Sequence, residues 1–366
     1  MHPTCLAIFL FLLASFFFQN LEAKIILPKN VTVPALIMFG DSIVDTGNNN
    51  HLATLFKCNF PPYGKDFLGG EPTGRFSNGR IPSDILAEEL GIKEFLPAYL
   101  DPNLQTEELL TGVCFASSGT GYDPLTSQVT SVLSLSDQLK LFKEYIEKLK
   151  TLVGEERTAT IISQSLYVVC AGSNDFLITY FLTPLRRAKY DVPAYTDFMI
   201  QSASTFLQEL YDLGARRIAV LSVPSVGCVP YARSLLGGIG GGRGGDGGCI
   251  EDVNEAAQLF NAKLSSQMDW LNNKFPEARM VYIDVYFPLL HLNRRPRDYG
   301  FEEVSKGCCG TGKIEVAELC NDLNPFTCTD VSKYVYWDSV HPTEKAYQII
   351  FASVEMQAQS LIYKFF

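Results

Sequence analysis

The chain has 366 residues, of which 47% are hydrophobic and 19% are charged, and its formal net charge at pH 7 is −10. This composition can supply a large hydrophobic core, and it excludes a chain that is mostly disordered. The negative charge is not interrupted by any run of Lys and Arg, which argues against nucleic acid as a partner.

The first 23 residues predict a secretory signal peptide. Residues 6–18 (LAIFLFLLASFFF) are 13 uninterrupted apolar or small residues, whereas a membrane span needs about 20. Leu21-Glu22-Ala23 follows and ends in the small residue that signal peptidase accepts. An uncleaved anchor or a buried helix is the alternative, because no Lys or Arg precedes the apolar run. We expect residues 24–366 to be secreted without stable membrane insertion and Asn30, in the sequon Asn30-Val31-Thr32, to be glycosylated.

Export would place the cysteines in an oxidising compartment, where disulfides form. Signal cleavage would remove Cys5 and leave nine of the ten cysteines, so at least one thiol would stay free or pair between chains. Cys228 and Cys249 flank the glycine-rich segment 235–248, and we expect them to pair. The pairing of a second group cannot be assigned from spacing: Cys308, Cys309, Cys320 and Cys328. The candidates for a free thiol are Cys58, Cys114 and Cys170.

Five apolar runs predict β-strands in chain order. Each is nearly continuous rather than alternating, which is typical of strands buried on both faces of a sheet. The runs are 35–40, 112–116, 166–171, 217–223 and 279–285.

Helical patterns fill the intervals between these runs. Pro82 is placed to open the first helix, Gly214 and Pro276 to end the third and fourth, and Thr343 supplies half of a capping box for the last. Strands that alternate with helices predict one domain built on a parallel sheet. Active sites of such open sheets lie beyond the carboxyl ends of the strands. The predicted helices are 82–90, 136–152, 194–213, 252–275 and 343–363.

Cofactor motifs are absent or incomplete. Residues 240–245 fit G-x-G-x-x-G, but no predicted strand precedes them, so we interpret the match as low complexity. Residues 307–313 fit most of a phosphate-binding loop, but Ile314 replaces the Ser or Thr that would hold Mg²⁺. H-E-x-x-H does not occur, and three His in the mature chain are too few for a multi-His metal centre. We therefore expect neither a cofactor nor a metal.

The strand ends carry the residues of a serine hydrolase. Ser42 follows the first run, in FGDSIVD, and Asp338 and His341 stand in WDSVHP just before the last helix. A serine hydroxyl becomes a good nucleophile only when a base takes its proton. His341 is the best-placed base, and Asp338 can bind its other ring nitrogen and fix the tautomer.

The same strand ends supply donors for an oxyanion. The carbonyl oxygen that becomes negative during acyl transfer needs hydrogen-bond donors already aimed at it. The backbone N–H groups of Ser42 and Gly119 and the side-chain amide of Asn174, in GSND, are the candidates.

These blocks resemble the SGNH hydrolase superfamily, and the chain from residue 34 to residue 363 resembles a plant GDSL-type esterase/lipase. The resemblance implies a flavodoxin-like three-layer α/β/α sandwich with a five-stranded parallel sheet, an ester or lipid substrate, and a location in the cell wall or apoplast. The matching blocks are GDSIVDTGNNN, PPYGKDF, GRFSNGR, GSND, KGCCGTG with LCN, and WDSVHPTEKAY.

By this resemblance Ser42 is the nucleophile, His341 the base and Asp338 the residue that orients it. Gly119 and Asn174 are then oxyanion donors. The second family block usually reads A-S-G-G-A-G, and here Ser118 replaces its first Gly. The backbone N–H of Ser118 is therefore an alternative donor to that of Gly119.

Three functions remain open from the sequence. The first is a secreted esterase/lipase that hydrolyses carboxylic esters through an acyl-enzyme on Ser42. The second is an extracellular acyltransferase that uses the same three residues with an alcohol acceptor. The third is a catalytically weak lipid-binding protein of a coat or matrix. Neither the natural substrate nor the oligomeric state can be predicted.

Overall fold

The computed structural model describes residue 25 and residues 31–237, 248–323 and 326–365, with side chains up to Val354 in the last segment. The predicted signal peptide at residues 1–23, the sequon residue Asn30 and the glycine-rich match at 240–245 lie outside the described residues.

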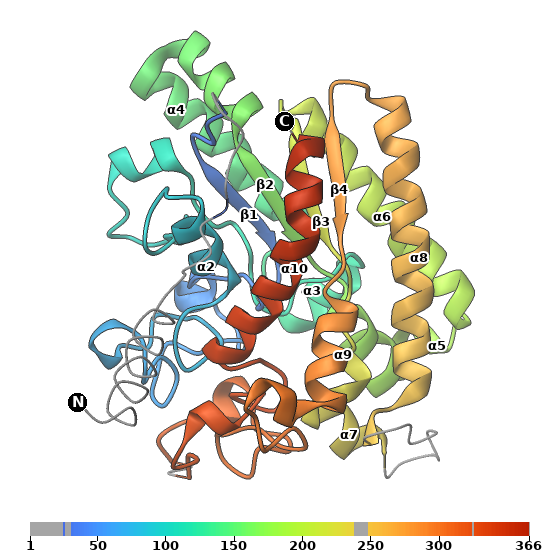
Figure 1. Ribbon diagram of the computed structural model, residues 1–366. Helices are drawn as coiled ribbons and strands as arrows, with labels where there is room; N and C mark the ends of the chain where they lie inside the picture. The colour runs from blue at the N-terminus through green and yellow to red at the C-terminus, as the bar shows by residue number, and fades with distance from the viewer. Residues whose placement is uncertain (1–24, 26–30, 238–247, 324–325, 366) are drawn as a thin grey trace, which may run out of the picture.

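Four parallel strands form the centre of the molecule (Figure 1). They are adjacent in chain order, and Gly40 at the end of the first pairs with Cys170 at the end of the second. Four of the five predicted strands are therefore confirmed, with bounds that differ by a few residues. The strands are β1 (Leu36–Gly40), β2 (Leu166–Cys170), β3 (Arg217–Leu221) and β4 (Arg279–Ile283).

The prediction of a fifth strand at 112–116 is wrong. The segment lies beside β1, where the Phe115 N–H donates to the Met38 carbonyl oxygen at 2.8 Å, but Cys114 makes only isolated bridges, one to Met38 and one to Ala98. Gly112, at φ 95°, breaks the extended backbone just before the segment, and a turn at Ser117 follows directly, so no ladder develops.

This segment still occupies the place of an outer strand. It comes second in the chain and lies outside β1, whereas the later strands lie on the other side of β1. The chain therefore changes direction across the sheet at β1. Ligands of doubly wound sheets bind at such a switch point, beyond the carboxyl end of the strands, which directs attention to the turn that follows Gly40.

The five predicted helices are present, and the longest extends beyond its predicted end, with an interruption at Gly154. The prediction missed a π-helix at Asp175–Leu182 and several helices of four to nine residues, which are too short to show a clear period. No helix within the described residues is both long and apolar enough to cross a membrane. The helices are α2 (Pro82–Glu89), α3 (Pro124–Thr130), α4 (Leu135–Gln164), α5 (Pro184–Arg187), α6 (Val192–Asp212), α7 (Pro230–Leu236), α8 (Glu251–Lys274), α9 (Tyr286–Arg294) and α10 (Glu344–Phe365).

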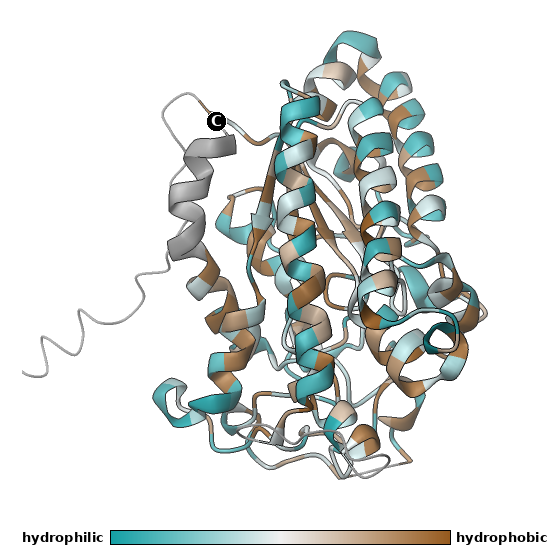
Figure 2. Cartoon of the chain, turned by 90° about the vertical axis from the view of Figure 1, so that its right-hand side faces the viewer, coloured by the Kyte–Doolittle hydropathy of each residue, from teal (hydrophilic) through white to brown (hydrophobic). Residues whose placement is uncertain are grey.

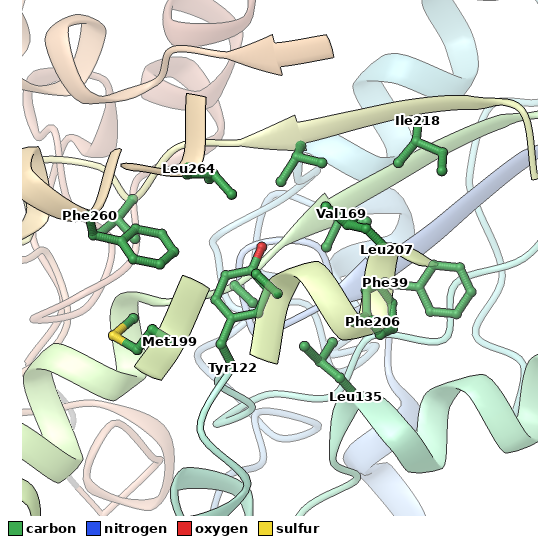
Figure 3. Packing of buried hydrophobic residues seen from close by; sticks show 14 of the residues in the cluster. Phe39, Tyr122, Leu135, Val169, Met199, Phe206, Leu207, Ile218, Phe260 and Leu264 are labelled. Carbon is green, nitrogen blue, oxygen red and sulfur yellow. The ribbon is translucent and has the colours of Figure 1, made fainter. Parts of the chain in front are cut away.

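Helices cover both faces of the sheet, which confirms the three-layer α/β/α sandwich (Figure 2). Successive strand residues point to opposite faces. Phe39 points to one face and packs against Phe206 of α6, in the large cluster that Figure 3 shows, which also contains Phe260 of α8. Met38 points to the other face, where α2 and α10 lie and the buried cluster is much smaller.

Three disulfides are formed among the described cysteines. Cys228 pairs with Cys249, as predicted from the flanking positions. The other two could not be assigned from sequence, and they join Cys308 to Cys328 and Cys309 to Cys320. The three candidates for a free thiol, Cys58, Cys114 and Cys170, form no disulfide and are buried. Burial raises the pKa of each thiol, so all three stay protonated.

Candidate active site

The structure brings Ser42, His341 and Asp338 into one hydrogen-bonded line. Ser42 lies on the turn that follows β1, and the other two lie on the loop before α10, 299 residues further along the chain. The Ser42 Oγ is 2.8 Å from His341 Nε2, and His341 Nδ1 is 2.7 Å from Asp338 Oδ2. All three side chains are buried.

The Asp338 carboxylate is fixed by donors on both of its oxygens. Its Oδ1 accepts the backbone N–H groups of Val340 at 2.8 Å and His341 at 2.7 Å. Its Oδ2 accepts the Tyr63 hydroxyl at 2.7 Å in addition to the imidazole. A carboxylate held in this way favours the tautomer with a proton on Nδ1, which leaves Nε2 free to accept the Ser42 proton.

Sequence reasoning did not identify Tyr63 or Phe76 as neighbours of the site. The Tyr63 hydroxyl accepts the Ala317 N–H at 2.9 Å, and burial raises its pKa well above the usual value, so it reaches Asp338 as a donor. The Phe76 ring packs 4.8 Å from the His341 ring, centroid to centroid. Tyr63 belongs to the PPYGKDF block and Phe76 to the GRFSNGR block. The match of these two blocks to the family was the sequence signal that could have indicated them.

Two of the predicted oxyanion donors, Ser42 and Asn174, line one cavity, whose lining does not include Gly119. The Asn174 Nδ2 donates to the Thr120 carbonyl oxygen at 2.9 Å, which uses one of its two N–H groups and leaves the second available. The Ser118 N–H donates to Asp45 Oδ2 at 2.9 Å, so this alternative donor is engaged. Gly119 follows it, at φ 91°, in a conformation that favours glycine.

Buried polar side chains brace the loops that carry these residues. Asp45 Oδ1 accepts the N–H groups of Gly47 and Asn48, each at 2.8 Å. The Asn48 amide in turn donates to the carbonyl oxygens of Cys114 and Ala116. These contacts tie the turn after β1 to segment 112–116, so Asp45 and Asn48 brace the loop that carries Ser42.

A second brace lies on the far side of the site. The Asp175 carboxylate, next to Asn174, accepts the N–H groups of Tyr122 at 2.8 Å and Asp123 at 3.1 Å and the Thr126 hydroxyl at 2.6 Å. It thereby fixes Asn174 against the loop that carries Gly119. No group of three or more His, Cys, Asp or Glu in the described ranges is arranged to hold a metal ion.

Comparison with known proteins identifies the family. The model of the family GDSL-like Lipase/Acylhydrolase matches residues 36–354. The chain belongs to this family. GDSL esterase/lipase At5g42170 from Arabidopsis thaliana is 56% identical over 329 residues, covering 90% of this chain and 87% of that protein. GDSL esterase/lipase EXL3 from the same plant is 51% identical over 339 residues, with coverages of 93% and 91%.

Among solved structures, a catalytic mutant of Axe2, an acetylxylan esterase from Geobacillus stearothermophilus, aligns over 92% of this chain and 96% of that chain, at 12% identity and a TM-score of 0.41. The family match and the plant relatives confirm the plant GDSL-type esterase/lipase predicted from the sequence blocks. This GDSL protein is a carboxylic ester hydrolase, and its substrates are esters.

The stability of this hydrolase should fall as pH rises from about 4 to 8. Burial raises the pKa of Asp41 and Asp175 to about 7 and that of Asp45 to about 6, from an ordinary 3.8. In this interval the folded chain binds more protons than the unfolded chain, so the contribution is full at low pH and is lost as pH passes the folded pKa values. We expect the three groups to lower Tm by about 5 °C between pH 5 and pH 8.

Asp41→Asn removes the contribution of one of the three carboxyl groups to this pH dependence. The amide oxygen can still accept the Ile43 N–H, which Asp41 Oδ1 accepts at 3.1 Å. Calorimetry at both pH values should show the Tm of the variant rising relative to wild type as pH increases. A constant difference between the two proteins would contradict the prediction.

Proposed function

We propose that this GDSL protein is a secreted serine esterase that hydrolyses carboxylic esters through an acyl-enzyme on Ser42. The observation that carries the proposal is the line of hydrogen bonds from Ser42 Oγ to His341 Nε2 at 2.8 Å and from His341 Nδ1 to Asp338 Oδ2 at 2.7 Å. Nucleophile, base and orienting carboxylate stand in the order that this chemistry requires.

Acylation begins when the Ser42 Oγ attacks the ester carbonyl carbon and His341 Nε2 accepts the hydroxyl proton. The imidazolium is stabilised by Asp338, which stays ionised. His341 then gives the proton to the alkoxide that leaves, and the acyl group remains on Ser42. In the second half a water molecule, deprotonated by His341, attacks the acyl-enzyme and releases the acid.

The oxyanion that forms in both halves is stabilised by the N–H groups of Ser42 and Gly119 and by the second N–H of Asn174. Asn174→Ala is expected to lower kcat by about 10²–10³-fold with little change in KM, because this hydrogen bond strengthens in the transition state. Steady-state kinetics on a soluble ester measure the change. A loss confined to KM would assign Asn174 to ground-state binding instead.

Labelling with a fluorophosphonate tests the proposal directly. Residues 24–366, secreted from a eukaryotic host, would be treated with the probe, and mass spectrometry would locate the adduct. We expect it on Ser42, and we expect its formation to slow greatly in His341→Ala. A folded protein with intact disulfides that does not react at Ser42 would refute the serine mechanism.

Secretion to the cell wall or apoplast and a single domain over residues 24–366 are part of the proposal. The apolar run at 6–18 and the three disulfides support export. A family match that runs continuously over residues 36–354 supports one domain. Glycosylation of Asn30 would follow from export.

The acyltransferase alternative shares every step up to the acyl-enzyme and differs only in the acceptor. Product analysis with and without an added alcohol separates it from hydrolysis. The binding-protein alternative would fit a disturbed site, but the Ser118 N–H donates to Asp45 and the hydrogen bonds that join Ser42, His341 and Asp338 are intact. The hydrolase is therefore the function that the site supports best.

A further inference from the structure

A cavity of about 190 Å³ is lined by Ser42, by the sheet and by the helices α2 and α10, and it also reaches Val226 and Leu289, beyond the ends of β3 and β4. Figure 1 shows α10 crossing in front of the strands, with α2 beside it. The floor of the cavity consists of strand residues that point to this face of the sheet. They are Met38 of β1, Val168 of β2, Ala219 of β3 and Ile283 of β4.

The side chains of α2 and α10 do not fill the space above these strand residues. Leu86 of α2 and Ile350, Phe351 and Val354 of α10 line the cavity, yet each is only half-buried. The large cluster on the opposite face contains buried helix residues such as Phe206 of α6 and Phe260 of α8.

Polar groups occur only at the Ser42 end of this cavity. They belong to Asp41, Ser42, Ser173, Asn174 and Tyr347. The rest of the wall is apolar and offers no set of partners for ordered water, which needs two to four. An apolar cavity with one polar end suits an amphiphilic ligand whose reacting group stays at Ser42.

The length of the cavity matches a long alkyl chain. Both Leu166, the first residue of β2, and Cys170, the last, line it. Four steps along a parallel strand cover about 13 Å, the extended length of roughly a dozen carbons. The Ser42 end of the wall adjoins the His341 loop through Val340 and Pro342, so the two sites are continuous.

We propose that this cavity holds the acyl chain of the substrate, so that the enzyme prefers esters of unbranched acids of about ten to twelve carbons. The inference rests on the proposed function, because it places the ester carbonyl at Ser42. Each methylene that enters the cavity favours binding by about fourfold until the cavity is full. Very short acyl groups would react without using the cavity.

The test measures kcat/KM for nitrophenyl esters from acetate to palmitate, at concentrations below aggregation. We expect kcat/KM to rise by about 4,000-fold from butyrate to decanoate, fourfold for each of the added methylenes, and then to level off. A flat profile would overturn the inference while leaving the esterase in place. Decyl acetate cleaved as well as ethyl decanoate would assign the cavity to the alcohol side and overturn it also.

Two half-buried positions allow the cavity to be blocked without disturbing the catalytic residues. Leu86→Trp places a larger side chain in the cavity wall and should reduce kcat/KM for decanoate to about the butyrate level. Val354→Trp, on the later part of α10, should affect only the longer esters. Ala352→Trp is the matched control, because Ala352 is exposed on the same helix. Equal losses on butyrate and decanoate would overturn the inference.

A binding measurement separates this inference from the proposed function. Titration calorimetry with decanoate, which has the proposed chain length, needs no turnover. Saturable binding to the wild-type protein that is lost in Leu86→Trp and kept in Ala352→Trp would support the cavity even if no ester were cleaved. Absent binding, or equal binding to all three proteins, would overturn it even if short esters were cleaved.

Discussion

Replacing Ser42 with alanine is expected to lower kcat for any ester that the protein cleaves by about 10⁵-fold or more. The variant loses the only hydroxyl within hydrogen-bond distance of His341 Nε2 among the described residues, so no acyl-enzyme can form. KM should change little, because the cavity wall and the oxyanion donors stay in place. Stopped or long-time ester hydrolysis assays, with the protein purified from a host that lacks esterases, measure the loss.

Asp338→Asn separates the orienting role from the nucleophile. The amide can present its NH₂ to His341 and so favour the wrong tautomer, which is expected to lower kcat by about 10⁴-fold. Its Oδ1 could still accept the Val340 and His341 N–H groups, so the loop should keep its shape. Double variants of Ser42 and Asp338 should be no slower than Ser42→Ala, since the residues act as a unit. Substantial activity in Ser42→Ala would refute the proposed mechanism.

The sequence was sufficient for most of the sheet because its strands are buried on both faces, and such strands appear as continuous apolar runs. The same pattern led to the wrong prediction of a strand at 112–116. That segment is equally apolar, but a strand also needs a ladder of hydrogen bonds, and Gly112 and the turn at Ser117 restrict it to isolated bridges. Apolarity reports burial, whereas the ladder depends on backbone geometry at both ends of the run.

The candidate site was predictable in part for a related reason. Ser42 and Asn174 end neighbouring parallel strands, so chain position alone brings them to one edge of the sheet. Tyr63 was not predictable, because its partner Asp338 lies 275 residues away and loop residues have no periodicity that would disclose the contact. The resemblance marked its block without indicating what its side chain touches.

The largest stability effect is expected at Asp84, a buried carboxylate on α2. It accepts both Nε and Nη2 of Arg75, each at 2.8 Å, and the backbone N–H groups of Ile81 and Leu96. Asp84→Ala would leave the buried Arg75 guanidinium without its counter-charge, and we expect the free energy of unfolding to fall by about 3–5 kcal/mol. Urea or thermal unfolding measures this loss.

An exposed pair provides the comparison. Glu147 and Lys150 on α4 form an ion pair whose side chains are 69% and 39% exposed, so Glu147→Ala should leave stability essentially unchanged. The buried pair is different because desolvation makes the unpaired charge costly, not because the pair itself contributes much. Replacing both partners, with Arg75→Met and Asp84→Leu, should therefore recover a large part of the stability that Asp84→Ala loses.

The double variant also tests what the pair does for the active site. The Arg75 Nη1 donates to the Thr46 carbonyl oxygen at 3.2 Å, and its Nη2 donates to that of Leu96 at 3.0 Å. Thr46 lies on the loop that begins at Ser42, so removing the guanidinium releases this loop while restoring an apolar core. We expect the double variant to unfold at a higher temperature than Asp84→Ala and yet to have a lower kcat than wild type. Full activity would show that Asp45 and Asn48 hold the loop without Arg75.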